Sequence, residues 1–309
     1  MPRPIQLLDA QAALGFVLAQ TTYIERQAYE IVYGDIQYQD LIPVDSSAPD
    51  WIKSVTFYSN DKFGKAEWIN GNADDVPRAG SERSKYESYV YTAGIGYGYG
   101  LEEISQAQMM GYDLPGTDAM AARRAYEEFV DGVLLRGSAS KGMSGLISYP
   151  GITAITAPTG NWATATAAQI LADVNAALMP TFAGSYYTMI ADTLLLPFER
   201  LQILAQTVLP NTTMTVLAFL QQQNLYTQQT GRPLVIRGTT GLLTAGGSGT
   251  ARMVAYKRDP QVLKAHIPMP HRFLPVYQAS PLRFEVPGIF RLGGLDIRLP
   301  QGVRYLDGI

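Results

Sequence analysis

The sequence predicts an α+β protein of two domains, and three patterns among its 309 residues support this fold class. Residues 86–101 alternate strictly in side-chain character, as successive positions of one long β-strand do. Residues 118–137 form the longest helical pattern in the chain. After Pro150, short helical and strand patterns alternate, which is typical of a separate α/β layer. A chain of this length is long enough for its core to divide into two.

The composition is unusual for a free-standing monomer. Charged residues make up 17% of the chain, against about 25% in ordinary domains, and there are 19 tyrosines. The cores of protein interfaces are depleted in Lys, Glu and Asp and enriched in Tyr. The composition therefore fits a subunit covered by other subunits, although a tyrosine-rich core would give the same totals.

Several classes of function are disfavoured by the totals. The absence of cysteine excludes disulfides, thiolate metal sites and a cysteine nucleophile. The chain has a net charge of -3 and no basic run, whereas tight binding to a phosphate backbone needs clustered Lys and Arg. We therefore expect at most weak, nonspecific contact with nucleic acid. No segment approaches the roughly 20 apolar residues of a membrane span, which predicts a soluble protein made in a cytoplasm.

The first third of the chain predicts an arm followed by a hairpin. Residues 1 to about 40 contain short amphipathic pieces interrupted by glycine, as in an arm rather than a core. Residues 39–49 carry two prolines and should run extended before looping. Residues 54–71 alternate and turn as a β-hairpin does, and the polar stretch 71–84 is expected to be its exposed tip or edge.

The long strand has an aromatic face and a bare face. We expect one strand of about 15 residues, on the order of 50 Å long. One face carries Tyr89, Tyr91, Ala93, Ile95, Tyr97, Tyr99 and Leu101, and the other carries Gly94, Gly96, Gly98 and Gly100. A spacing of two does not fit the glycine motifs of phosphate-binding loops. Glycines on one strand face instead allow another backbone or a helix to approach closely.

Two helices are predicted directly after this strand. The first covers residues 101–110, and the second covers 118–137, with Thr117 or Asp118 as its N-cap and Gly137 as its stop. The apolar stripe expected on the second consists of Ala121, Ala125, Phe129, Val133 and Leu134. Outside it lie Arg123, Arg124, Glu127 and Glu128. These four are either a solvated face or partners for neighbouring copies.

The α/β layer is predicted from five segments. They are helices at 164–179, 198–206 and 215–224 and strands at 188–197 and 233–238. The C-terminal region is predicted to form strands, and its prolines at 281, 287 and 300 should fall at strand edges or ends.

No group of residues predicts catalysis, a cofactor or a metal. Ser138 and Lys141 match the S-x-x-K of serine acyl-enzymes, but the companion motifs of that machinery are missing. His266 and His271 stand among prolines without carboxylates at metal-ligand spacing, so we expect exposed or structural histidines. We therefore predict no catalytic, cofactor-binding or metal-binding residues and no enzymatic activity.

A family resemblance emerges when the motifs are taken in order. After the long strand come GLEE at 100–103, AARRAYEE at 121–128 and GLISYPGI at 145–152, with DLIPVD at 40–45 upstream and GGLDIRLPQGVRYLD at 293–307 downstream. This series resembles the major capsid proteins of tailed bacteriophages, which have the Hong Kong 97-type fold. The related encapsulin shells share that architecture.

The resemblance implies a division of the chain into five parts. They are an N-terminal arm (1–53), an extended β-hairpin loop (54–86), a peripheral domain with a long spine helix (87–149), an axial domain (150–265) and C-terminal strands that return to the peripheral domain (266–309). Some relatives link subunits through Lys and Asn, but no motif identifies such a pair here. The chain begins close to the arm, so we expect no scaffold segment within it.

The leading functional hypothesis is a coat protein that forms pentamers and hexamers of an icosahedral shell around double-stranded DNA. Such a protein would act in the virion after assembly in the cytoplasm of a bacterial host. Its partner would be itself, with possible scaffolding, portal or decoration proteins and no membrane. We expect subunit contacts at Tyr89, Tyr91, Tyr97, Tyr99, Arg123, Arg124, Glu127 and Glu128. An encapsulin-like compartment is the second hypothesis, and a serine acyl hydrolase using Ser138 and Lys141 is the third.

Overall fold

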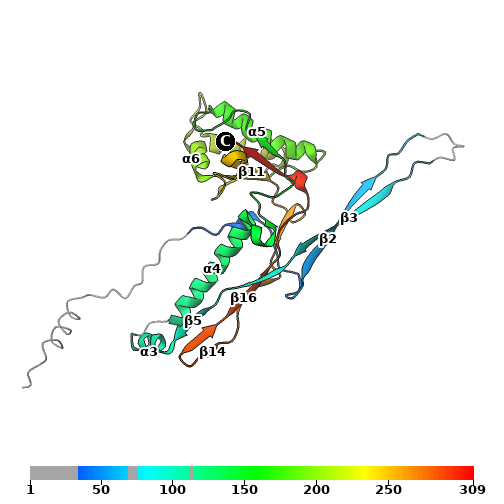
Figure 1. The fold of residues 1–309 in the computed structure, drawn as a ribbon. Helices are drawn as coiled ribbons and strands as arrows, with labels where there is room; N and C mark the ends of the chain where they lie inside the picture. The colour runs from blue at the N-terminus through cyan, green and yellow to red at the C-terminus, as the bar shows by residue number, and fades with distance from the viewer. Residues whose placement is uncertain (1–33, 69–75, 111–113) are drawn as a thin grey trace, which may run out of the picture. The chain divides into compact units, whose positions relative to one another are not determined.

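The computed structural model describes residues 34–68, 76–110 and 114–309 (Figure 1). Most of the predicted arm, residues 1–33, and part of the predicted hairpin tip, residues 69–75, lie outside the described residues. The chain divides by its contacts into residues 1–35 and 36–309, and the description that follows concerns the second unit.

The predicted hairpin is confirmed. Strands β2 (Ser54–Phe63) and β3 (Gly80–Tyr89) pair antiparallel over all ten positions, from Ser54 opposite Tyr89 to Phe63 opposite Gly80. Just before it, the short helix α2 (Tyr38–Leu41) and strand β1 (Val44–Asp45) lead into the hairpin. The two strands pair only with each other, and most of their residues are exposed.

The prediction of one uninterrupted strand over residues 86–101 is wrong. The segment changes partner twice: β3 pairs with β2, β4 (Tyr91–Gly94) with β16 (Gly288–Leu292), and β5 (Tyr97–Gly100) with β15 (Arg283–Val286). Pro287, between β15 and β16, has no N–H to donate, and the ladder is interrupted opposite it. Val90 is buried between the hairpin and β4.

The expected role of the glycines is confirmed for three of the four; at Gly100 an added Cβ would lie 3.8 Å from the nearest backbone atom, an ordinary contact. A Cβ added at Gly94 would lie 2.7 Å from the carbonyl oxygen of Gly288, and one at Gly98 would lie 2.8 Å from that of Phe284. A Cβ at Gly96 would collide with the carbonyl oxygen of Val286. The glycines therefore let the neighbouring β15–β16 backbone approach closely.

Helix α3 (Leu101–Met110) begins where it was predicted, and the long helix α4 runs from Leu114 to Arg136. The predicted start of α4 at Asp118 is wrong, because Pro115 is accommodated in the first turn, where its missing N–H costs nothing. The predicted stop is confirmed: Gly137 has φ +89°, which favours glycine. Among the described residues α4 is the longest helix.

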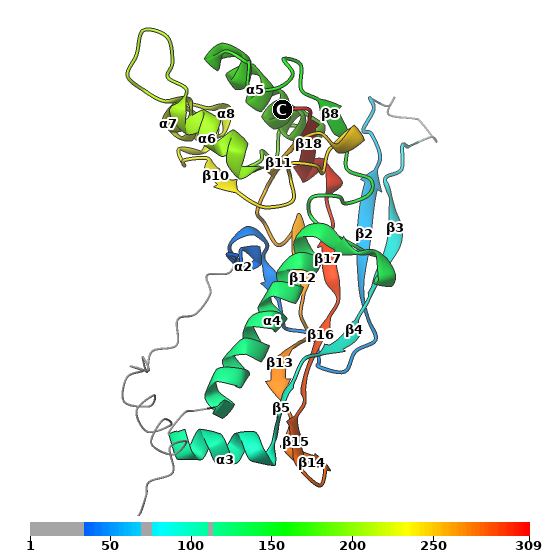
Figure 2. The same cartoon turned by 60° about the vertical axis from the view of Figure 1, so that its left-hand side comes forward.

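The predicted apolar stripe of α4 is confirmed at Val133 and Leu134, but nearer the start of the helix the buried positions lie one residue later. Its buried residues include Ala122, Tyr126 and Val130, whereas Ala121 is exposed and Phe129 is 49% exposed. Tyr126 sets which side of the helix is buried here. Its ring centroid lies 4.8 Å from that of Phe290 on β16 and 5.3 Å from that of His271. Figure 2 shows α4 lying along the strands that carry these rings.

The C-terminal strands mostly pair with this first layer. Strand β12 (Leu263–His266) lies between β1 and β17 (Gly294–Ile297), β13 (Met269–Phe273) pairs with β16, and β14 (Tyr277–Ser280) pairs with β15. Pro281 and Pro287 directly follow strands β14 and β15, as predicted, whereas Pro300 begins a 3₁₀ turn (Pro300–Gly302) between β17 and β18. The remaining small pair is β6 (Gly137–Ser138) with β7 (Met143–Ser144).

The predicted α/β layer is built on a five-stranded sheet in the order β10-β9-β11-β18-β8. Its strands are β8 (Ala154–Thr156), β9 (Thr193–Leu196), β10 (Val235–Gly238), β11 (Arg252–Tyr256) and β18 (Val303–Asp307). The sequence division placed β18 with strands returning to the peripheral domain, whereas β18 pairs with β8 and β11. The C-terminus therefore ends inside the five-stranded sheet.

Helices α5 (Ala167–Gly184), α6 (Phe198–Gln206), α7 (Val216–Gln222) and α8 (Leu225–Thr230) belong to this layer. Helix α5 starts at a capping box between Thr166 and Gln169. It continues past the predicted end at Met179, because residues on both sides of Pro180, including Leu178 and Thr181, are buried.

The five-stranded sheet contributes to two hydrophobic clusters. Alternate residues of β11 and β18 point to opposite sides, so Val254 and Tyr305 lie in the cluster with α4, while Met253 and Leu306 lie in the cluster with α5. One sheet thus serves both cores.

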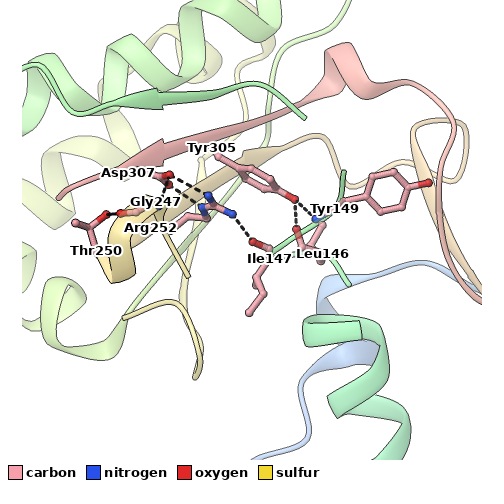
Figure 3. A network of polar contacts seen from close by, with 8 residues as sticks. All are labelled: Leu146, Ile147, Tyr149, Gly247, Thr250, Arg252, Tyr305 and Asp307. Carbon is pink, nitrogen blue, oxygen red and sulfur yellow. Dashed lines mark hydrogen bonds and ion pairs between the residues drawn. The ribbon is translucent and has the colours of Figure 1, made fainter. Parts of the chain in front are cut away.

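A polar network fixes the segment after α4 to this sheet (Figure 3). Arg252 donates to Asp307 at 2.7 and 2.9 Å and to the carbonyl oxygen of Ile147 at 2.8 Å. The hydroxyl of Tyr305 donates to the carbonyl oxygen of Leu146 at 2.6 Å and accepts from the amide of Tyr149 at 2.9 Å. The chain leaving α4 is therefore tied to β11 and β18.

Candidate assembly surfaces

The four tyrosines expected at subunit contacts differ in exposure. Tyr89 is 61% exposed, while Tyr91, Tyr97 and Tyr99 are half-buried. Tyr97 packs edge-on against Phe273 at 5.2 Å. Three of the four thus contact their own subunit through part of the ring, and Tyr89 offers the largest free surface. Their role in subunit contacts stays a prediction.

The charged face of α4 is partly satisfied within the subunit. Arg124 pairs with Glu128 at 2.9 Å, and Arg123 lies 3.6 Å from Glu127. Glu127 also accepts a 2.6 Å hydrogen bond from the hydroxyl of Tyr38, and burial together with this bond raises the pKa of Tyr38. The arginine with the loosest partner, Arg123, has a side chain that is 60% exposed. A role for these four residues between subunits also stays a prediction.

The S-x-x-K match is a turn rather than a catalytic pair. Ser138 is the N-cap of the 3₁₀ turn at Ala139–Lys141, and Lys141 is its last residue. The hydroxyl of Ser138 lies 3.1 Å from that of Ser140, and the ammonium of Lys141 lies over the ring of Tyr91 at 5.1 Å from its centroid. Neither contact prepares a serine for nucleophilic attack.

Both histidines are structural, which was one of the two expected outcomes. His266 is buried, with Nε2 3.0 Å from a carboxylate oxygen of Asp296, and the Nε2 of buried His271 lies 3.0 Å from the carbonyl oxygen of Ile95. Among the described residues no group of three or more His, Cys, Asp or Glu is arranged to hold a metal ion. None of the helices in that part of the chain is long and apolar enough to cross a membrane.

The hairpin carries different charges on its two faces. On one face lie Lys62, Arg83 and Lys85; Arg83 bonds to Asn60 at 3.0 Å, and Lys85 pairs with Glu87 at 3.4 Å. The other face carries two carboxylates directly opposite each other, Asp61 and Glu82.

Large apolar side chains are exposed along the same hairpin. Tyr58 and Phe63 are each 60% exposed and Tyr86 is 51% exposed. An isolated two-stranded hairpin is at best marginally stable in water, so these rings need a covering surface. The hairpin is therefore the clearest candidate for contact with another molecule.

Charges are almost missing from the helical side of the α/β layer. The 90 residues from 142 to 231 contain only Asp173, Asp192, Glu199 and Arg200. Asp173 is buried and accepts hydrogen bonds from Thr159 and Trp162. A surface with so few charges can face its own copies without repulsion between like charges.

The charge-poor segment and the opposed carboxylates of the hairpin were not predicted from the sequence, for two different reasons. The low charge fraction was noted as a total, but its concentration in residues 142–231 could have been read directly from the sequence. The opposition of Asp61 and Glu82 depends on the hairpin register, and the turn that sets the register could not be fixed from composition.

An exposed hairpin with two different faces and a charge-poor surface are the features of a protein that is completed by contact with other molecules. The sequence profile of the major capsid protein family matches residues 64–309. The chain belongs to this family, and its role as a component of the virion capsid is structural rather than enzymatic. Assembly with copies of itself follows from that membership.

Solved structures confirm the predicted Hong Kong 97-type fold. The capsid of Myoviridae phage XM1 matches with a TM-score of 0.80 at 19% identity, over 94% of this chain and 98% of that chain. The capsid of a native GTA particle matches at 0.66 and 10% identity, over 97% and 99%. A virus-like particle from Pyrococcus furiosus matches at 0.50 and 14% identity, over 87% and 91%. No curated protein matches the sequence.

Proposed function

We propose that this chain forms the pentamers and hexamers of an icosahedral shell that encloses the double-stranded DNA of a tailed phage. The observation that carries the proposal is the β2–β3 hairpin, which exposes aromatic and charged side chains over most of its length and is covered by its own subunit only near its base, where Arg298 lies over Phe57. Burying these rings against neighbouring copies would remove them from water at each of many equivalent positions.

The expected division into arm, extended hairpin loop, peripheral domain, axial domain and C-terminal strands belongs to this proposal. In such a shell the hairpin and arm cross to adjacent subunits, and the charge-poor surface of residues 142–231 meets its own copies around ring axes. Contacts without fixed charge pairs tolerate small shifts, which suits rings of both five and six subunits.

The wider context is part of the same proposal. Assembly would take place in the cytoplasm of a bacterial host, with scaffolding, portal or decoration proteins as additional partners. Contact with DNA would be weak and nonspecific, because the chain has a net charge of -3 and no run of basic residues.

Electron microscopy of the expressed chain, alone and with the scaffolding protein of its own genome, tests the proposal. Closed shells with five- and six-subunit rings are expected. Only monomers or small oligomers under all assembly conditions would contradict it.

An encapsulin-like compartment is the second candidate, favoured by the likeness to the virus-like particle from Pyrococcus furiosus. That likeness is weaker than the one to the phage XM1 capsid. The two functions differ in content: a phage shell copurifies with DNA and tail proteins, and a compartment copurifies with one enzyme bound to its inner wall.

A further inference from the structure

Two exposed surfaces, each with apolar and charged side chains, lie at opposite ends of one extended run of chain. The first, the outer hairpin face, consists of Asp61, Phe63, Gly80 and Glu82. The second, the β14–β15 tip, consists of Val276, Tyr277, Leu282 and Arg283. Residues 80–100 run from one to the other through β3, β4 and β5 (Figure 1).

The outer hairpin face continues a face that is covered at its base. Near the base, Phe57 on this face lies under the guanidinium of Arg298, 4.9 Å from the ring centroid, and Ser88 donates to Asp296. Farther out, Phe63 is 60% exposed and has no such cover. The same face therefore has one covered aromatic ring near the base, Phe57, and one exposed aromatic ring farther out, Phe63.

The exposed ring of Phe63 is held in place by its cross-strand neighbour. A Cβ added at Gly80 would lie 2.8 Å from one ring atom of Phe63 and closer still to another. The ring therefore rests across the bare backbone of Gly80 and does not fold away from solvent. A pre-positioned ring loses little entropy when a partner covers it.

Two carboxylates lie beside this ring, so a partner surface that covers it should carry a positive charge. Asp61 and Glu82 stand directly opposite each other, and like charges in that arrangement destabilise a strand pair. In the part of the chain the structure describes, neither forms an ion pair with a Lys or Arg. A surface that combines apolar side chains with an arginine would complement the outer hairpin face.

The β14–β15 tip has that combination. Leu282 is 65% exposed, Val276 58% and Tyr277 49%. The side chain of Arg283 is 65% exposed and lies 3.1 Å from Glu285. Glu285 also accepts a 2.8 Å hydrogen bond from the hydroxyl of Tyr277, so its charge is shared within the tip.

The two surfaces cannot meet within one subunit. The 21 residues from 80 to 100, at about 3.3 Å per residue, separate them by several tens of ångströms even with the breaks at Val90 and Ile95. Two copies placed head to tail can bring one surface against the other, and a heterologous contact of this kind closes into rings.

We propose that the outer hairpin face of one copy docks on the β14–β15 tip of a second copy, with Arg283 meeting the Asp61–Glu82 pair and Leu282 covering Phe63. The inference rests on the proposed shell function and adds which face of the hairpin makes the contact, and with what. The basic face, with Lys62 and Lys85, is left free of this contact.

A charge exchange tests the docking. The variant Asp61→Arg, Glu82→Arg keeps two like charges opposite each other in the hairpin and reverses only their sign. We expect the fraction of chain in shells, measured by sedimentation and electron microscopy, to fall at least tenfold at low salt, and the loss to shrink at 1 M salt, where exposed charges are screened. Adding Arg283→Glu reverses the second surface in every copy and should restore assembly to within about twofold.

The matched control reverses two charges on the opposite face of the same strands, Lys62→Glu with Lys85→Glu, and should assemble within about twofold of the wild type. A single Asp61→Lys variant supplies a further readout. If the carboxylates acted only within their own hairpin, this change would relieve their repulsion and assembly would stay the same or rise; docking predicts that it falls.

Circular dichroism of unassembled subunits confirms that each variant folds. Normal assembly of the Asp61→Arg, Glu82→Arg variant, or no recovery on adding Arg283→Glu, would overturn the docking while leaving the shell function intact. Failure of the wild-type chain to assemble in the same assay would instead contradict the proposed function.

Discussion

Removing the guanidinium of Arg252 should destabilise the subunit strongly. Arg252 binds both carboxylate oxygens of Asp307, at 2.7 and 2.9 Å, donates to the carbonyl oxygen of Ile147, and stacks on Tyr305 with its Cζ 4.4 Å from the ring centroid. The change Arg252→Met keeps an unbranched stem in place and removes all of these polar contacts. It leaves the carboxylate of Asp307 with only the amide of Gly247, at 3.0 Å.

The size of the effect follows from burial. The side chains of Arg252 and Asp307 are 11% and 13% exposed. Breaking a fully buried ion pair costs about 3–5 kcal/mol, and the remaining exposure lowers our expectation to about 2–4 kcal/mol. With an entropy of unfolding of about 2.1 cal/mol/K per residue, this corresponds to a fall in melting temperature of about 3–6 °C.

Urea titration and calorimetry of unassembled subunits measure the loss, and an exposed pair provides the control. Arg124 and Glu128 are 38% and 46% exposed at 2.9 Å, so Glu128→Gln should cost no more than about 0.5 kcal/mol. A double variant, Arg252→Met with Asp307→Asn, should lose less than the sum of the single losses, because neither charge is left alone. Equal losses for Arg252→Met and Glu128→Gln would refute the reasoning.

Three further predictions concern single positions. Gly96→Ala should prevent close pairing with β15–β16, because its Cβ would collide with the carbonyl oxygen of Val286, and soluble expression should drop sharply. Thr166→Ala removes the capping box of α5 and should cost about 1 kcal/mol in urea titration; Thr166→Ser should recover most of it. Burial raises the pKa of Tyr305 to about 12, so the free energy of unfolding should decline between about pH 10 and 12 as the unfolded state loses the proton first. Tyr305→Phe should start lower and show a flatter decline there; an unchanged slope would show that Tyr305 does not cause it.

Local patterns predicted much of the fold. The hairpin, the helix at 198–206 and the glycine stop at Gly137 all depend on contacts or conformations close in sequence, and each was confirmed. The prolines at strand ends were equally predictable, because a missing N–H limits where a strand can continue.

The errors came from long-range packing. The first part of the α4 stripe was placed one residue away, because a tyrosine such as Tyr126 can lie on a buried or an exposed face; in the fold its ring packs against Phe290, more than 160 residues later. The long strand was predicted as one element because its alternation is continuous, yet it changes partner twice, at Val90 and opposite Pro287. Neither partner is visible from the local pattern.

The candidate surfaces were predicted only in part. The aromatic face and the charges of α4 were found from periodicity, but their satisfaction within the subunit, such as the bond from Tyr38 to Glu127, needed the fold. The outer hairpin face was not predicted, because Asp61 and Glu82 are 21 positions apart in sequence and are brought opposite each other only by the strand register.

Hydrogen exchange of the hairpin before and after assembly tests the central claim, that copies of this chain complete one another, most directly. The account predicts rapid exchange of the amides in 54–63 and 80–89 in unassembled subunits, because the two strands pair only with each other. In shells the same amides should exchange at least a hundredfold more slowly. Equal protection in the two states would contradict the account, because the hairpin would then be complete within its own subunit.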